Sequence, residues 1–299
     1  MILDCAVIGG GPAGLNASLV LGRSRRNTVL FDDDKPRNSV TNESHGFITR
    51  DGINATELRR IAREELSKYP DVKIRKQRVI DVTKKGKLFT IGTEVGEVYK
   101  AKKVVLATGL KEKLPDINRI NHFYGTSIFS CPFCDGWELK DRPLAVIAEN
   151  SRAFHMAKVV YNWSNDLIVC TNGSQSLSIN EKEILKEKGI KIYEQKISSL
   201  IGKNGYLKSI SFEEGTTISR EGGFVVPEME QGSSIGEVLG CKLNNQGAIN
   251  TDGIGRTNVE GVFACGDTSI IAPSQLIIAA AEGSKAAIGV NAALVEETF

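Results

Sequence analysis

The chain has 299 residues, of which 41% are hydrophobic and 25% are charged, and 30 of them are glycines. Its length predicts about two domains of roughly 150 residues each, and its composition excludes a disordered or fibrous chain. The net charge is +2, and no apolar run approaches the ~20 residues of a membrane-spanning helix. We therefore expect no nucleic acid and no membrane as partner, and Asp4 near the amino terminus argues against a signal peptide and for a cytoplasmic protein.

The amino-terminal residues predict a nucleotide-binding unit. A strand at 2–8 is followed by the turn Gly9-Gly10-Gly11-Pro12-Ala13-Gly14, a helix at 15–23, a strand at 28–31 and then Asp32. In such a turn the first glycine permits a sharp bend, the third lets the backbone approach a pyrophosphate, and the last allows close packing of helix on strand. A diphosphate would lie at the helix N-terminus, and the acid can accept hydrogen bonds from a ribose. The order of these parts predicts a dinucleotide site.

The middle of the chain predicts further strands and helices. An amphipathic helix at 55–68, whose arginines we interpret as a solvated face, precedes an antiparallel meander at 72–99 and a buried strand at 103–109. Pro115 and the polar residues after it are interpreted as a linker. A second alternating region has predicted strands at 144–148, 166–170 and 190–193, and helices at 151–163 and 181–188. A long apolar helix is predicted at 275–294. The repeated pattern favours two nucleotide-fold domains.

One close pair of cysteines, Cys131 and Cys134, stands out among the six in the chain. Scattered cysteines fit a reducing compartment better than a disulfide framework. Two intervening residues let the sulfurs meet within one helical turn, so the pair can cycle between disulfide and dithiol. A structural zinc site needs four ligands, and Cys170 and Cys241 have no partner at metal spacing. We predict a redox pair and no metal site, and interpret Cys5, Cys170 and Cys265 as apolar filler.

Four motifs together resemble the low-molecular-weight thioredoxin reductases: residues 7–14, Ala107-Thr108-Gly109, residues 131–136 and residues 257–267. The resemblance covers nearly the whole chain. It implies an α/β fold with two Rossmann-like nucleotide-binding domains, each of three layers (ββα). The FAD-binding domain would be split into residues 1–114 and 247–299, with an inserted NAD(P)-binding-like domain at 115–246 that carries the cysteine pair. A homodimer is a further expectation from this family.

The resemblance also implies roles for individual residues. The FAD diphosphate would lie at the turn, the ribose at Asp32, the ribityl and phosphate portion at Gly266 and Asp267, and the isoalloxazine ring near Gln275. The complete set of expected FAD residues is Gly9, Gly11, Pro12, Ala13, Gly14, Asp32, Thr108, Gly109, Gly266, Asp267 and Gln275.

The cysteine motif receives three roles from the same resemblance. Cys134 would exchange electrons with FAD and Cys131 would attack the substrate disulfide. Asp135 would protonate the departing thiolate, and its alternative role is that of a helix N-cap.

The resemblance fails where the family binds NADPH. The second glycine-rich turn of the family is replaced here by Ala148-Glu149-Asn150-Ser151-Arg152-Ala153. The Cβ atoms of Ala148 and Asn150 would intrude where backbone should meet phosphate, and Glu149 adds an unfavourable negative charge. The next strand ends without a basic cluster for NADPH or an acid for NADH. We therefore expect nicotinamide binding to be lost or weak.

These observations favour an FAD-dependent thiol-disulfide oxidoreductase that uses Cys131 and Cys134. Its expected electron donor is a carrier such as ferredoxin, and its expected acceptor is a thioredoxin-like protein or a low-molecular-weight disulfide. Three alternatives remain: a dithiol oxidase that passes electrons to oxygen, an NADPH-dependent thioredoxin reductase, and a flavin-binding redox sensor or scaffold. Known dithiol oxidases of this superfamily tend to place histidine after the second cysteine, where this chain has Asp135. His45, His122 and His155 are not beside the pair in sequence.

Overall fold

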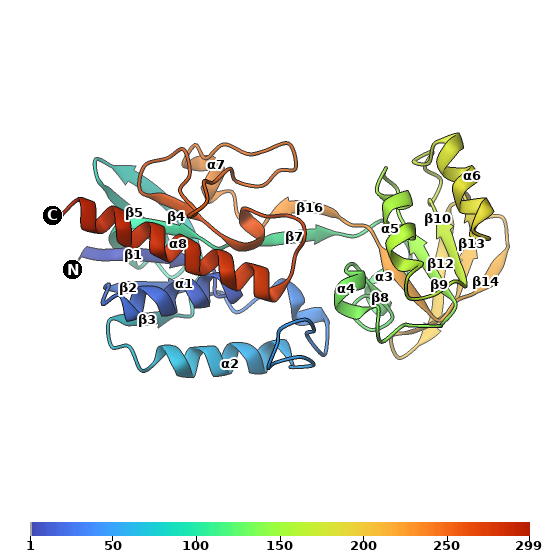
Figure 1. Ribbon diagram of the computed structural model, residues 1–299, viewed down its shortest axis with the longest axis horizontal. Coiled ribbons are helices and arrows are strands. Elements are labelled where there is room, and N and C mark those ends of the chain that lie inside the picture. Colours follow the sequence, from blue (N-terminus) through green and yellow to red (C-terminus); the bar gives the residue numbers. More distant parts are fainter. Residues whose placement is uncertain (1) are drawn as a thin grey trace. The chain divides into compact units, whose positions relative to one another are not determined.

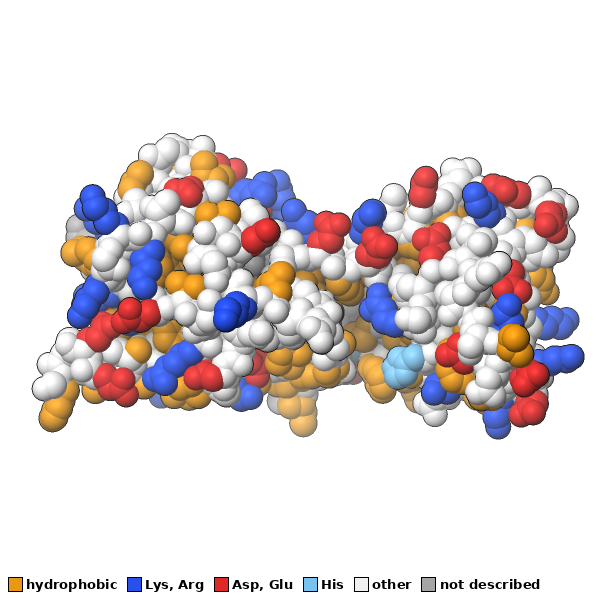
Figure 2. Space-filling view, turned by 90° about the horizontal axis from the view of Figure 1, so that it is seen from above, with side chains coloured by type: hydrophobic (Ala, Val, Ile, Leu, Met, Phe, Trp, Pro, Cys, Tyr) orange, Lys and Arg blue, Asp and Glu red, His pale blue; other side chains and the backbone are white. Residues whose placement is uncertain are grey.

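The computed structural model describes residues 2–299, and its internal contacts divide the chain into two compact units. The terminal unit consists of Met1–Ser39, Gly46–Lys111 and Met229–Phe299. The inserted unit consists of Val40–His45 and Glu112–Glu228. Positively and negatively charged side chains are interspersed over the face drawn in Figure 2, as the near balance of 38 basic and 36 acidic residues leads one to expect.

The terminal unit is built on a parallel sheet that continues into an antiparallel one. Its parallel strands are β1 (Ile2–Ile8), β2 (Thr28–Phe31), β3 (Val72–Arg75), β6 (Val98–Leu106) and β17 (Val262–Ala264). Strands β4 (Val79–Lys85) and β5 (Leu88–Thr93) pair antiparallel with each other and with β6. The predicted antiparallel meander was therefore wrong at its first strand, because β3 pairs parallel with β2 at the edge of the nucleotide-fold sheet.

Two cores lie on opposite faces of this sheet because side chains alternate along each strand. On β1, Cys5 and Val7 face the helix side, whereas Ala6 and Ile8 face the other. The helices on the helix side are α1 (Pro12–Arg23), α2 (Ala55–Leu66) and α8 (Leu276–Glu296). Figure 1 shows α1 and α8 side by side although they come from opposite ends of the chain. The Asn16 amide donates to the Ala280 carbonyl at 2.8 Å, so the two ends form one domain.

Helix α8 is the one helix within residues 2–299 that is long and apolar enough to cross a membrane by length and composition. The sequence alone suggested no such segment, since its apolar residues are interrupted by glycines and polar side chains. Seven of its small or apolar residues are buried: Ala279, Gly283, Ala286, Ala287, Gly289, Val290 and Leu294. One side of α8 thus packs against the core of the terminal unit.

The inserted unit repeats the three-layer arrangement. Its parallel sheet has the order β11-β10-β9-β15-β8, with bounds β8 (Ile128–Phe129), β9 (Leu144–Ile147), β10 (Leu167–Cys170), β11 (Lys191–Tyr193) and β15 (Gly222–Val225). Helices α5 (Ala153–Val160) and α6 (Ile179–Glu187) share one core with it. Strands β12 (Ile197–Lys203), β13 (Tyr206–Phe212) and β14 (Thr217–Ser219) share the other. Two Rossmann-like, three-layer domains are thus confirmed.

Some segments differ from the sequence-based expectation. The predicted linker after Pro115 contains helix α3 (Ile120–Phe123), and Ile117, Ile120 and Phe123 are buried in the core of the inserted unit. Strands β7 (Leu110–Lys113) and β16 (Glu228–Gln231) pair where the chain passes between the units. The second domain boundary was expected between residues 246 and 247. In the structure, α7 (Ile235–Val238) and Cys241 belong to the terminal unit because their apolar side chains join its core.

Candidate active site

The turn between β1 and α1 has glycine wherever a side chain would collide with the backbone. Gly9 has a φ of +112°, and a Cβ on it would lie 2.1 Å from the carbonyl oxygen of Ala107. A Cβ on Gly14 would lie 1.8 Å from the carbonyl oxygen of Gly9. A Cβ on Gly11 would instead enter open space. The turn therefore packs tightly against its own strand and leaves room in front of Gly11, where a diphosphate would fit.

The first turn of α1 favours an anion at the same place. Gly11 is the N-cap in an extended conformation, Pro12 follows at the first helical position, and no side chain within the described residues caps the helix. The free N–H groups and the dipole of this 12-residue helix both attract negative charge. These residues fit the diphosphate of FAD.

Asp32 follows β2 and is held by two arginines of α2. Its Oδ2 accepts hydrogen bonds from Arg59 at 3.0 Å and Arg63 at 2.5 Å, and its Oδ1 accepts the N–H of Asp34 at 2.9 Å. Burial alone would raise the pKa of Asp32, but the hydrogen bonds from Arg63 and Asp34 and the charge of Arg59 bring it below its ordinary value. The carboxylate is thus fixed as an acceptor.

The interpretation of the α2 arginines as a solvated face was wrong for Arg59, which is only 5% exposed. Arg59 and Arg63 are four residues apart, so they lie on the same face of the helix. That spacing, together with the acids after β2, is the pattern from which the cluster could have been recognised.

The carboxyl-terminal segment brings further residues to the terminal unit. The N–H of Gly109 donates to the Thr268 hydroxyl at 2.7 Å, and Thr108 lies 3.4 Å from the same oxygen. Helix η2 (Gly266–Thr268) approaches α1 closely, since a Cβ on Gly266 would lie 2.7 Å from the Cβ of Ala13.

Asp267 and Gln275 complete the set expected from the sequence. Asp267 accepts hydrogen bonds from Arg37 at 2.9 Å and from Ser274 at 2.8 Å, and Gln275 is the N-cap of α8. Sequence reasoning missed Arg37, which lies far from Asp267 along the chain and has no motif of its own.

Cys131, the N-cap of the short helix α4 (Pro132–Asp135), forms a disulfide with Cys134 in the same helix, with 5.3 Å between their Cα atoms. Two aromatic side chains beside it are largely exposed: Phe133 at 66% and Trp137 at 68%. The remaining cysteines are buried, and burial raises the pKa of Cys170 and Cys265 to about 12. Only the paired cysteines are therefore placed for thiol chemistry.

Asp135 is buried directly after the second cysteine. Its burial, together with the negative charges of Glu138 and Glu112, raises its pKa to about 7, and His45 acts in the opposite direction. Glu112 accepts a hydrogen bond from Ser130 at 2.9 Å and one from the Tyr124 hydroxyl. A carboxyl group that holds its proton near neutral pH can act as a general acid.

The turn after β9 is closed by its own polar groups. The Ser174 hydroxyl donates to the carbonyl oxygen of Glu149 at 2.7 Å, and the Glu149 carboxylate accepts from Asn172 at 2.5 Å. The side chain of Asn150 accepts the N–H of Arg152 at 3.1 Å, and the Arg152 guanidinium donates to the carbonyl of Pro227 at 2.6 Å. The Arg152 N–H and guanidinium, which could donate hydrogen bonds to a phosphate, thus donate to other groups of the protein.

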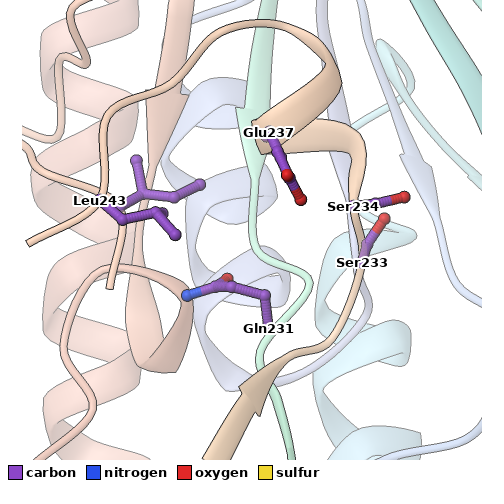
Figure 3. A pocket seen from close by; sticks show the side chains of 7 residues that line it. Gln231, Ser233, Ser234, Glu237 and Leu243 are labelled. Atoms are coloured by element: carbon purple, nitrogen blue, oxygen red, sulfur yellow. The ribbon is translucent and has the colours of Figure 1, made fainter. Parts of the chain in front are cut away.

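A separate pocket lies in the terminal unit (Figure 3). Its lining residues are Gln231, Ser233, Ser234, Gly236, Glu237, Leu243 and Ile249. The Gln231 amide donates to the carbonyls of Gly247 at 2.7 Å and Thr268 at 3.1 Å. The lining contains neither cysteine nor histidine, so the pocket offers no thiol or imidazole chemistry.

Comparison with known proteins agrees with this geometry. The family model of the pyridine nucleotide-disulphide oxidoreductases matches residues 3–283. The crystal structure of a putative thioredoxin reductase from Bacillus anthracis is 47% identical, with a TM-score of 0.96 over 99% of this chain and 100% of that one. A probable thioredoxin reductase of Arthroderma benhamiae is 30% identical over 98% of this chain and 81% of its own length. The thioredoxin reductase of Helicobacter pylori is 27% identical over 97% and 98%. The chain therefore belongs to the pyridine nucleotide-disulphide oxidoreductases, as an FAD-dependent enzyme of the low-molecular-weight, thioredoxin-reductase-like kind.

Proposed function

We propose that this enzyme reduces the disulfide of a thioredoxin-like protein, or a low-molecular-weight disulfide, with electrons from a carrier such as ferredoxin rather than from NADPH. FAD, when bound, supplies the two-electron chemistry that links a donor to a thiol pair. The residues proposed to hold it are the turn Gly9–Gly14 with Pro12 and Ala13, Asp32, Thr108 and Gly109, Gly266 and Asp267, and Gln275. NADH is no better a candidate donor than NADPH, since both would need the turn after β9.

The observation that carries this proposal is the closed turn after β9. A nicotinamide dinucleotide needs backbone N–H groups and a close approach for its diphosphate. Here Asn150 and Arg152 use their polar groups within the protein, and the Glu149 carboxylate would repel a phosphate. These contacts would have to break before a dinucleotide could bind.

The chemistry proposed for the inserted unit uses three residues. The Cys131 thiolate attacks the substrate disulfide, and the first substrate sulfur leaves and takes a proton from Asp135. The Cys134 thiol then gives its proton to Asp135 and attacks Cys131, which reforms the disulfide and releases the second substrate sulfur as a thiolate. That thiolate takes the proton from Asp135. The exposed rings of Phe133 and Trp137 give a protein partner apolar surface next to these sulfurs.

The proposal extends to a cytoplasmic homodimer. Three apolar side chains of α8 are exposed in the single chain: Ile277, Ile288 and Val295. A second copy could cover them, and the reducing cytoplasm would allow the disulfide to cycle. Sedimentation of the holoenzyme should give twice the mass of one chain.

Anaerobic mixing of the holoenzyme with one equivalent of NADPH, NADH, reduced ferredoxin or a dithiol tests the donor. We expect ferredoxin to bleach the flavin absorbance rapidly and both nicotinamides to leave it unchanged. Rapid bleaching by NADPH would contradict the proposal and favour the NADPH-dependent reductase. Bleaching by a dithiol alone, followed by oxygen uptake on aeration, would favour the dithiol oxidase. A flavin that no donor reduces would favour the sensor.

The Cys134→Ser variant tests the thiol pair. It should keep its FAD and lose electron transfer between flavin and substrate disulfide. Cys170→Ser changes a buried cysteine outside the pair and serves as the control. Wild-type turnover in Cys134→Ser would exclude the proposed role.

A further inference from the structure

A short loop of the amino-terminal region belongs by its contacts to the inserted unit. Residues Val40–His45 are part of that unit, whereas the segments before and after them, Met1–Ser39 and Gly46–Lys111, are part of the terminal unit. The loop packs closely, because a Cβ on Gly125 would lie 2.1 Å from the carbonyl oxygen of Val40. The loop therefore brings His45 to the unit that carries the disulfide, although nothing in the sequence places it there.

His45 lies among carboxylates next to the cysteine motif. Its Nε2 is 3.6 Å from Oε1 of Glu138 and 3.6 Å from Oε2 of Glu43, and its side chain is 17% exposed. Glu138 is three residues after Asp135, in the turn that follows α4. His45 therefore contacts the segment that carries Cys134 and Asp135.

The charges that face Asp135 come from three segments. Glu138 follows it along the chain, Glu112 approaches from β7, and His45 approaches from the loop. Both glutamates oppose ionisation of Asp135, and His45 favours it. Glu112 is hydrogen-bonded by Tyr124 and Ser130, and the Lys140 ammonium lies 3.3 Å from the centre of the Trp137 ring. His45 thus provides the charge that can balance an ionised Asp135.

We propose that His45 is a positioning residue of the disulfide site and acts through Asp135, whose carboxylate its positive charge stabilises. This inference rests on the thiol-disulfide chemistry proposed above. It does not depend on which donor reduces the flavin.

Asp135 and Cys134 each supply one proton during reduction of the substrate disulfide. The Cys131 thiolate forms a bond to one substrate sulfur, the substrate S–S bond breaks, and the departing thiolate takes the proton of Asp135. Asp135 then accepts the proton of the Cys134 thiol, which attacks Cys131 and releases the second substrate thiolate. That thiolate takes the same proton. Asp135 is left ionised, with the positive charge of His45 nearby, and regains its proton from solvent. Two thiols of the enzyme are oxidised and one substrate disulfide is reduced.

The pH dependence of alkylation of the chemically reduced holoenzyme by iodoacetamide tests this inference. Cys131 and Cys134 are partly exposed and the other cysteines are buried, so mass spectrometry can assign the label to the pair. The wild-type rate should show an inflection near pH 7 that Asp135→Asn abolishes. His45→Gln should move this inflection upward by about one pH unit, a tenfold change in proton affinity. Retained flavin absorbance reports that each variant is folded.

Two further variants separate charge from structure. His45→Lys keeps a positive charge and should hold the inflection near the wild-type position, whereas His155→Gln, an exposed histidine of the same unit, should leave the profile unchanged. A His45→Gln profile that superimposes on wild type would overturn the inference. An equal displacement in His45→Lys and His45→Gln would also overturn it, because the effect would then not follow the charge. A wrong donor assignment would leave all these profiles unaffected.

Discussion

The two strand-to-helix turns of this molecule have the same place in their domains and opposite local structures. After β1, the N-cap of the helix is Gly11, and the space where its side chain would lie is open. After β9, the N-cap is Arg152, whose N–H and guanidinium are both bonded to the protein. The sheets and helices around the two turns are nevertheless alike, because their cores are formed by strand and helix side chains and not by the turns. One scaffold can therefore keep its fold while the turn after its first strand changes.

Charged residues reinforce this difference. Near the first turn, Arg59 and Arg63 both donate hydrogen bonds to the buried carboxylate of Asp32. Near the second, the Glu149 carboxylate accepts a hydrogen bond from the uncharged amide of Asn172. The first turn therefore has a carboxylate paired with two positive charges, and the second has a carboxylate with a neutral partner.

The largest effect is expected from filling the open turn. Gly11→Val keeps an extended backbone that valine tolerates, since Gly11 has φ −76° and ψ −178°, but it places a side chain where the diphosphate would lie. FAD affinity should fall by about 100-fold or more, while the melting temperature of the apoprotein changes little. Fluorescence titration with FAD measures the affinity. Ser151→Val in the second turn is the control, and equal FAD binding by both variants would contradict the comparison.

If the inserted unit supplies thiol chemistry and binds no nucleotide, a change at Asp135 should affect the rate of disulfide reduction more than a change in the turn after β9. Asp135→Asn should slow single-turnover disulfide reduction about 100-fold at pH 7. The wild-type rate should fall as the pH rises through about 7, because the acid then loses its proton, and the variant should lack this dependence. The exposed Asp141→Asn is the control. A variant that retains both the rate and its pH dependence would remove Asp135 from the mechanism.

Asp135 should also make stability depend on pH. The folded state raises its pKa from 3.8 to about 7, so the folded state keeps a proton that the unfolded state releases, and stability falls between these two pH values as the pH rises. Asp135→Asn removes this cost. The free energy of unfolding of the variant minus that of wild type should be about 2.5 kcal/mol larger at pH 8 than at pH 5. Urea unfolding at the two pH values measures this difference in free energy. A difference that does not change with pH would show that burial does not raise the pKa of Asp135.

The arginine cluster can be tested by a pair of variants on one helix. Arg59→Met leaves buried Asp32 with one arginine fewer and should destabilise the protein by about 3 kcal/mol, with weaker FAD binding. Arg60→Met removes exposed ion pairs with Glu57 and Glu64 and should leave the melting temperature almost unchanged. Thermal unfolding of the two proteins provides the test. Equal melting temperatures would mean that the buried cluster contributes no more than the exposed one.

The smallest effect is expected from reopening the second turn. A triple variant, Ala148→Gly, Glu149→Gly and Asn150→Gly, removes the side chains that fill it and the negative charge. Reduction of the flavin by NADPH should rise only about fivefold, because no basic residue for the 2′-phosphate is added. Stopped-flow absorbance measures the rate. An increase to the rate given by ferredoxin would show that the turn alone excluded NADPH.

Much of this protein followed from local sequence patterns. The glycine turn at Gly9–Gly14, the pair Cys131 and Cys134, and the lack of glycine at Ala148 and Asn150 are all local features, and their chemistry follows from spacing and side-chain size. The two nucleotide folds followed from the alternation of strands and helices. Local patterns failed where partners are distant: β3 pairs parallel with β2, and the supposed linker after Pro115 buries Ile117 and Ile120.

The tertiary structure alone decided what surrounds the reactive groups. Asp32 receives Arg59 and Arg63 from α2, and Asp135 meets Glu112 and His45 from two remote segments. Such clusters form because the packing of apolar faces brings distant chain segments together. Burial then strengthens the interaction of each group with nearby charges, which shifts its pKa. The sequence by itself determined which side chains can carry the chemistry, and the fold determined their charge states.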